Sequence, residues 1–308
     1  MSNPVSSVPR SIIYEVRLSR KNFGILCVLL SGLFFGLIGY FGLNAMNANL
    51  SVYTMLLWRF IACSLFILAM LLPQIKLLTV HPVELFKIFL YGVVFYSATS
   101  IFYFLASYHL GSGLAMVIFF TYPAMVMFIN RLVYRSKVSK TYLLSLLVLA
   151  LGMLLLMNGS SGKFDALGIA FSLLSALFYA LYVVVSKKSP VAPLPSTFVL
   201  SMGCILTCCI AAIIDNSLIL PSNSKAWINI GGIGIICTAL PIFFLLKGLK
   251  YLSTTQASIL SVLEPVFVVI FGITLLGESI NLIQFIGITA LLGGALISLL
   301  NDNPKLVK

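Results

Sequence analysis

The chain has 308 residues, of which 61% are hydrophobic and only 8% are charged, and its mean hydropathy is +1.13. Soluble globular domains carry about 25% charged residues, so this composition excludes a soluble domain and indicates an integral membrane protein. The formal net charge is +12. In a soluble protein that charge would suggest a nucleic-acid partner. Here the basic residues lie between apolar runs, so membrane topology explains them and we expect no nucleic-acid partner.

Ten apolar segments follow one another along the chain, each of about 17–25 residues, which is the length of a membrane-spanning helix. They cover residues 23–43, 52–72, 85–107, 113–133, 141–157, 166–186, 197–214, 227–246, 254–276 and 280–300. The loops between them are short, so no soluble domain is inserted. We therefore predict an all-α integral membrane protein with ten transmembrane helices.

Lys and Arg residues set the orientation of these segments. If the segments alternate in direction, sixteen basic residues fall on the side of the termini: Arg10, Arg17, Arg20, Lys21, Lys76, Lys87, Arg131, Arg135, Lys137, Lys140, Lys187, Lys188, Lys247, Lys250, Lys305 and Lys308. Only Lys163 and Lys225 fall on the other side, and Arg59 lies inside a span. Basic residues concentrate on the cytoplasmic side of membrane proteins. The pattern predicts a multi-pass protein of the cell (inner or plasma) membrane with both termini in the cytoplasm.

The two halves of the chain resemble each other. GILCVLLSGLFFGL at 24–37 aligns with GIAFSLLSALFYAL at 168–181, with eight identities in 14 positions, and at a slightly different offset Pro123 aligns with Pro265. Each half has an odd number of spans, so the halves must have opposite orientations. A five-plus-five inverted repeat with a site between the halves is typical of secondary transporters. We expect a cytoplasmic arm, two five-helix repeats and a cytoplasmic tail at residues 1–21, 22–158, 165–301 and 302–308.

Several motifs resemble one family. LLWRF at 56–60, the AS-x(5)-EP spacing from Ala257 to Pro265 and the segment LEPVFVVIFGITLLGESINLIQFIG at 263–287 are similar to the EamA branch of the drug/metabolite transporter superfamily. The resemblance covers essentially the whole chain, although the first half is more diverged and has Tyr122 where the second has Glu264. It implies a permease that exports small metabolites, often amino acids, through a central cavity. It does not name the substrate.

Glu264 and Arg59 are the leading site candidates. A carboxyl near the middle of a span costs about 3 kcal/mol to insert, so Glu264 should face protein or water. It could carry a coupling proton, bind a cationic group, or act as a structural carboxyl beside the backbone that Pro265 loosens. Arg59 could bind a substrate carboxylate or pair with Glu264. It could also tie helices together near the membrane surface.

Tyrosines inside the spans form a second group of candidates. Tyr122 precedes Pro123 and is the counterpart of Glu264, and the two prolines could act as hinges. A phenol inside a span needs a polar partner. Further candidates for the cavity are Tyr40, Tyr96, Tyr103, Tyr179 and Ser258. Each of these residues could instead serve packing between helices.

These observations favour a secondary active transporter that exports amino acids or related metabolites by alternating access. We expect the metabolite, the lipid bilayer and a coupling proton as its partners, and no cofactor. The six cysteines lie inside apolar runs without a CxxC pair, and we expect no metal site. A lipid or drug flippase on the same fold is the alternative. A lipid-modifying enzyme is disfavoured, because the acidic residues are scattered and form no catalytic cluster.

Overall fold

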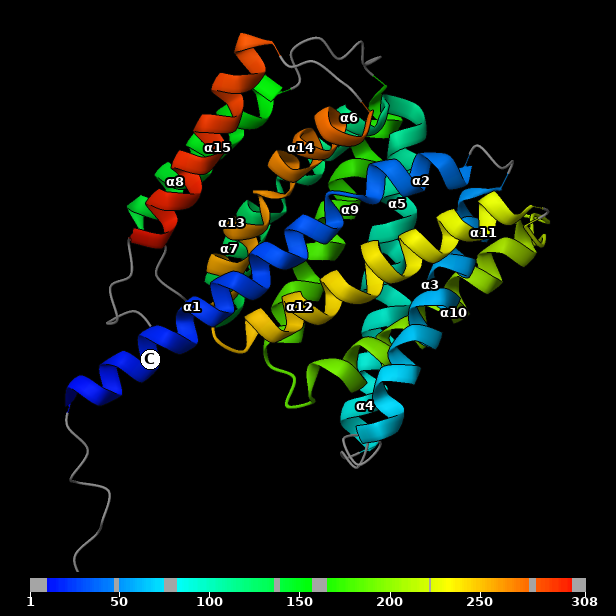
Figure 1. The fold of residues 1–308 in the computed structure, drawn as a ribbon, viewed down its shortest axis with the longest axis horizontal. Coiled ribbons are helices and arrows are strands. Elements are labelled where there is room, and N and C mark those ends of the chain that lie inside the picture. Colours follow the sequence, from blue (N-terminus) through cyan, green and yellow to red (C-terminus); the bar gives the residue numbers. More distant parts are fainter. Residues whose placement is uncertain are drawn as a thin grey trace, which may run out of the picture.

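A computed structural model of the chain describes residues 10–46, 50–74, 82–135, 139–156, 165–221, 223–276 and 281–300 (Figure 1). Over these residues the elements are helices without a strand. Eight helical stretches are long and apolar enough to cross a bilayer, and two shorter apolar helices cover Lys140–Leu156 and Leu282–Ile297. The prediction of an all-α, multi-pass membrane protein is confirmed. Residues 1–9 of the expected arm and the expected tail at 302–308 lie outside the described residues.

The two halves contain similar series of helices, except that α1 and α2 of the first half stand where the second half has the single helix α9. The first half consists of α1 (Arg10–Phe35), α2 (Ile38–Met46), α3 (Val52–Leu71), α4 (Pro82–Tyr91), the π-helix η3 (Gly92–Tyr96), α5 (Ser97–Leu110), α6 (Ser112–Phe119), α7 (Tyr122–Tyr134) and α8 (Lys140–Leu156). The second half consists of α9 (Ala166–Lys187), α10 (Pro193–Ile214), α11 (Ser224–Gly231), the π-helix η4 (Gly232–Ala239), α12 (Leu240–Leu249), α13 (Thr254–Ser261), α14 (Glu264–Leu276) and α15 (Leu282–Leu300).

Two predicted spans are broken in the middle, where we had expected one bent helix each. One break separates α6 from α7, and the other separates α13 from α14. Pro265 has no N–H to donate to the preceding turn. The helix ends in a tighter turn before this proline. The N–H groups of Val262 and Leu263 donate to the carbonyls of Ile259 and Leu260, three residues back. The break before Pro123 is similar. The helices beside the two breaks correspond at one constant offset in the sequence: residues 112–119 to 254–261, and residues 122–134 to 264–276.

Two other spans contain a π-helical segment at matching places. In the first half η3 lies between α4 and α5, and in the second half η4 lies between α11 and α12. A π-helix adds a residue to the turn and often marks a functional position. The last residue of η3 is Tyr96, and η4 contains Thr238. Both residues recur in the site described below.

Helices α8 and α15 lie side by side at one edge of the molecule (Figure 1). Their backbones approach closely where both carry glycine: a Cβ added at Gly287 would lie 2.8 Å from the carbonyl oxygen of Gly152. The Ser145 hydroxyl also donates to the Gly294 carbonyl at 2.6 Å. Small residues and a hydroxyl at a helix crossing are the usual means of association in a bilayer.

The bundle has two ends with different charge. One end holds the start of α4 and the turn from α12 to α13 (Figure 1). It carries Arg20, Lys21, Lys87, Arg131, Arg135, Lys140, Lys187, Lys188, Lys247 and Lys250, together with the acid Glu84, among the described residues, and we call it the basic end. The other end, where α5 meets α6 and α10 leads toward α11, carries His109, Asp165, Asp215 and Lys225. We call it the opposite end.

Candidate functional site

A cavity lies in the middle of the bundle, between helices of both halves. It has about 510 Å³ of empty space, a figure that includes the open solvent at its mouth. It is lined by Phe35, Ile38, Arg59, Tyr96, Thr99, Ser100, Tyr103, Phe104, Met116, Phe119, Tyr179 and Glu264. The first half supplies ten of these residues, and α9 and α14 of the second half supply Tyr179 and Glu264.

Arg59 is held at the wall of the cavity by the second half of the chain. Its side chain is 3% exposed, and its Nε–H donates to the Thr238 hydroxyl oxygen at 2.6 Å. The Thr238 hydroxyl in turn donates to the Ile233 carbonyl at 2.6 Å, five residues back, across the widened turn of η4. The guanidinium also lies 6.0 Å from the centre of the Phe104 ring. Its remaining N–H groups have no hydrogen-bond partner among the described residues, so they can bind a ligand.

Glu264 is the first residue of α14 and presents its half-buried side chain to the same cavity. At this position the break before Pro265 leaves it at a helix N-terminus, where a carboxyl is favoured. Arg59 acts on it electrostatically, but the part of the chain that the structure describes contains no salt bridge between them. The prediction that Arg59 pairs directly with Glu264 is therefore not realised in this conformation.

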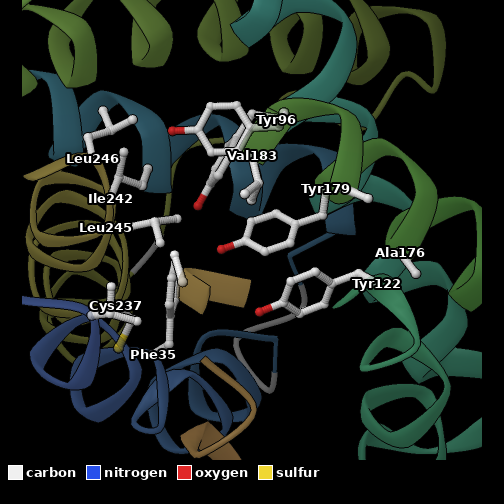
Figure 2. Packing of buried hydrophobic residues seen from close by; sticks show 14 of the residues in the cluster. Phe35, Tyr96, Tyr122, Ala176, Tyr179, Val183, Cys237, Ile242, Leu245 and Leu246 are labelled. Atoms are coloured by element: carbon white, nitrogen blue, oxygen red, sulfur yellow. The ribbon is translucent and has the colours of Figure 1, made fainter. Parts of the chain in front are cut away.

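Three of the predicted tyrosines line the cavity. Tyr96 is 3% exposed and Tyr179 is 6% exposed, and Tyr103 completes the set. Tyr179 packs edge-on against Tyr122, with ring centres 4.8 Å apart. Figure 2 shows the hydroxyls of Tyr122 and Tyr179 pointing toward the side of the bundle that holds Phe35. The result is an aromatic cavity with a few hydroxyl groups, one guanidinium and one carboxyl.

Toward the basic end the bundle closes in a layer of polar contacts between the halves. The Tyr122 hydroxyl of α7 donates to the Ser258 carbonyl of α13 at 3.1 Å. About two turns further along α7, the Asn130 amide donates to the Thr254 hydroxyl at 2.7 Å. Lys187 adds a contact within the second half, because its ammonium donates to the Leu252 carbonyl at 2.8 Å. These contacts lie between the cavity-lining residues and the basic end.

The remaining predicted site residues lie outside the cavity wall. Tyr122 and Ser258 are each 1% exposed and form the contact just described. Pro123 and Pro265 are the second residues of α7 and α14, directly after the breaks. Tyr40 lies in α2, is 37% exposed and packs edge-on against Phe41. Its position gives no support to the prediction that it lines the site.

Sequence reasoning missed Thr238 and Asn130. Thr238 has no motif of its own, and only the widened turn of η4 brings it to Arg59. Asn130 is one of the few amides inside a predicted span, which is a signal that could have found it. Among the described residues no group of three or more His, Cys, Asp or Glu could hold a metal ion.

An acid and a histidine also pair at the opposite end. His109 Nδ1 lies 2.6 Å from Asp165 Oδ2 and joins the end of α5 to the start of α9. Asp165 also caps α9 by accepting a hydrogen bond from the Leu167 N–H at 2.9 Å. The Leu167 N–H, and then His109, hold the pKa of Asp165 below its usual value.

These features define a multi-pass helical membrane protein with an aromatic cavity between its halves. The sequence profile of the EamA-like transporter family matches residues 22–158 and again residues 166–300. The chain belongs to the EamA-like transporter family.

Two similar proteins are named as transporters. An uncharacterized transporter of Archaeoglobus fulgidus is 32% identical over 134 residues, which are 42% of this chain and 47% of that protein. The uncharacterized transporter YxxF of Bacillus subtilis is 25% identical over 198 residues, 62% of this chain and 63% of that protein. The matches thus span about half to just under two thirds of these relatives. A protein crystal structure has a TM-score of 0.76 at 15% identity, covering 92% of this chain and 99% of that chain, and shares the fold alone.

Proposed function

We propose that this protein is a secondary active transporter that exports amino acids or related small metabolites by alternating access. One observation carries the proposal. One cavity brings the carboxyl of Glu264 and the guanidinium N–H groups of Arg59, which have no partner among the described residues, into one aromatic space. Ionisable groups inside a membrane are costly and usually mark a substrate or ion pathway.

Each part of the cavity has a role in binding such a metabolite. The free N–H groups of Arg59 bind its carboxylate in a bidentate manner. Glu264 binds its amine or carries a coupling proton. The aromatic wall, which includes Tyr103 and Phe104, accepts its apolar part.

The surrounding topology follows the inverted-repeat hypothesis. The basic end faces the cytoplasm and both termini lie there. Ten helices cross the inner or plasma membrane, including α8 with its 17 residues, the lower limit for a span. The repeats cover 22–158 and 165–301, and they rock around the cavity with bends at Pro123 and Pro265. Because the hydrogen bonds of Tyr122 and Asn130 join the halves at the basic end, we assign this conformation to the state in which the cavity is reached from the opposite, extracytoplasmic side.

The test is flux of labelled amino acids in proteoliposomes, with and without a pH gradient. We expect Arg59→Gln to abolish transport, while the matched change Lys225→Gln, at an exposed lysine of the opposite end, leaves it unchanged. A thermal-shift screen of amino acids, nucleosides and ammonium or sulfonium compounds identifies binders, because a ligand of the folded state raises its stability. The proposal is wrong if no small metabolite is bound or moved.

A further inference from the structure

The contact that closes the basic end depends on a buried backbone carbonyl that lacks its usual helical donor. Ser258 lies in the last turns of α13, and the residue that would normally donate to its carbonyl, Val262, donates to Ile259 instead. The Tyr122 hydroxyl takes the vacant place at 3.1 Å and so joins α7 of the first half to α13 of the second. Both residues are 1% exposed, so a missing donor would leave a buried carbonyl unsatisfied.

The second half carries the counterpart of each partner. At the constant spacing that aligns 112–119 and 122–134 with 254–261 and 264–276, Tyr122 corresponds to Glu264 and Ser258 corresponds to Met116. Glu264 and Met116 both line the cavity. The contact that is closed between Tyr122 and Ser258 is therefore open between their counterparts, and the cavity occupies the space between them.

We propose that Glu264 closes the opposite end: when the cavity opens at the basic end, the protonated Glu264 carboxyl donates to the Met116 carbonyl, as Tyr122 now donates to Ser258. The proposal rests on the transport function proposed above, because in an inverted repeat the two halves can exchange conformations. Met116 can accept this bond, since its carbonyl has two lone pairs and Phe120 N–H uses one of them at 3.0 Å.

Protonation is essential to this contact. An ionised carboxylate has only acceptor atoms, and a carbonyl is also an acceptor, so the two cannot bond. Tyr122 always carries its proton at neutral pH. Glu264 can make the corresponding contact only in its protonated form. Closing the opposite end therefore requires a proton on Glu264.

The electrostatic surroundings of Glu264 come from five other elements. The titratable and charged side chains that act on it or are affected by it are Arg59 of α3, Tyr96 of η3, Tyr103 of α5, Tyr122 of α7, Tyr179 of α9 and Cys237 of η4. The test keeps all of them unchanged and alters Glu264 alone.

Two variants of Glu264 separate hydrogen bonding from titration. Glu264→Gln keeps a donor but cannot titrate, and Glu264→Leu has similar size but no donor. The reporter is Ser100→Cys in the cavity wall, modified by a membrane-impermeant thiol reagent added from the opposite side of oriented proteoliposomes. Protein with only the six native cysteines gives the background.

Each rate is divided by that of an exposed control cysteine, Lys225→Cys, at the same pH, because acidification also lowers the reactive thiolate fraction. We expect acidification of that side to slow this corrected rate in the parent protein by about 5–150-fold, the usual size of such couplings. The corrected rate should be slow at every pH for Glu264→Gln and fast at every pH for Glu264→Leu. The inference is overturned if Glu264→Leu slows on acidification like the parent, or if Glu264→Gln keeps the parent's pH dependence. Either variant is decisive if the other fails to fold.

The labelling assay needs no substrate. Its result therefore tests the gating role of Glu264 separately from the proposed transport of amino acids. Metabolite flux together with normal closure of Glu264→Leu would overturn the gating role alone. Absence of flux together with the expected labelling would leave the gate and overturn the choice of substrate.

Discussion

Replacing Tyr122 by Phe removes one oxygen atom from the contact that closes the basic end. The ring remains, and so does its edge-on packing against Tyr179 at 4.8 Å. The Ser258 carbonyl loses the donor that lies 3.1 Å away, and no helical N–H replaces it, because Val262 turns back to Ile259. A buried polar group left without a partner costs about 1–3 kcal/mol.

This cost applies only to the conformation in which the contact exists. The equilibrium should therefore shift away from the closed basic end by about 5–150-fold, the equivalent of 1–3 kcal/mol. Modification of Ser100→Cys gives the assay: in the Tyr122→Phe protein it should slow from the opposite side and become faster from the basic side. Tyr108→Phe is the matched control, because Tyr108 is 79% exposed at the opposite end. Equal labelling of the parent and Tyr122→Phe from both sides would refute the reasoning.

Three further predictions concern other parts of the molecule. Thr238→Val removes the acceptor at 2.6 Å from Arg59 Nε and should weaken binding of a carboxylate substrate by about 10–150-fold, measured as its Kd in titrations. Gly287→Ala should lower stability by about 1–3 kcal/mol, because its Cβ would lie 2.8 Å from the Gly152 carbonyl oxygen. Gly293→Ala is the matched change in the same helix: its Cβ meets nothing within 4 Å, so thermal unfolding should show no loss of stability and up to about 1 kcal/mol of gain. The pKa of Asp165 is lower in the folded protein than in the unfolded chain, where it is about 4. The stability that this difference contributes is present above about pH 4 and is lost as the pH falls through the folded pKa. Asp165→Asn should therefore flatten the acid side of a plot of Tm against pH.

Hydropathy and charge were enough to predict the class of fold. Spans of about 20 apolar residues leave few alternatives to a helix in lipid, because every backbone N–H must find a partner within the segment. The breaks before Pro123 and Pro265 could be placed for the same reason, although their form could not. Whether a proline bends a helix or divides it depends on nearby acceptors and donors, such as the hydroxyl of Tyr122 for the Ser258 carbonyl.

The cavity was harder to predict than the helices. Glu264, Arg59, Tyr96, Tyr103 and Tyr179 were identified because polar or aromatic groups inside a span need a reason to be there, and all five line the cavity.

Other positions depend on helix rotation, which hydropathy does not reveal. Tyr40 is a tyrosine inside an expected span like the lining tyrosines, yet in α2 it is 37% exposed. Thr238 looks like an ordinary small polar residue until η4 brings it against Arg59.

The paired π-helices bear on the history of the chain. A widened turn arises when one residue is inserted into an α-helix that cannot shift its ends, and it persists only where it is useful. Here η3 and η4 occupy matching places in the two halves, and each delivers a residue to the cavity or to its guanidinium. If the halves descend from one gene, the simplest account places the insertion before the duplication. The ancestral five-helix chain then already possessed this turn. Two copies of that chain, assembled in opposite orientations in the membrane, would have enclosed a cavity before they were fused.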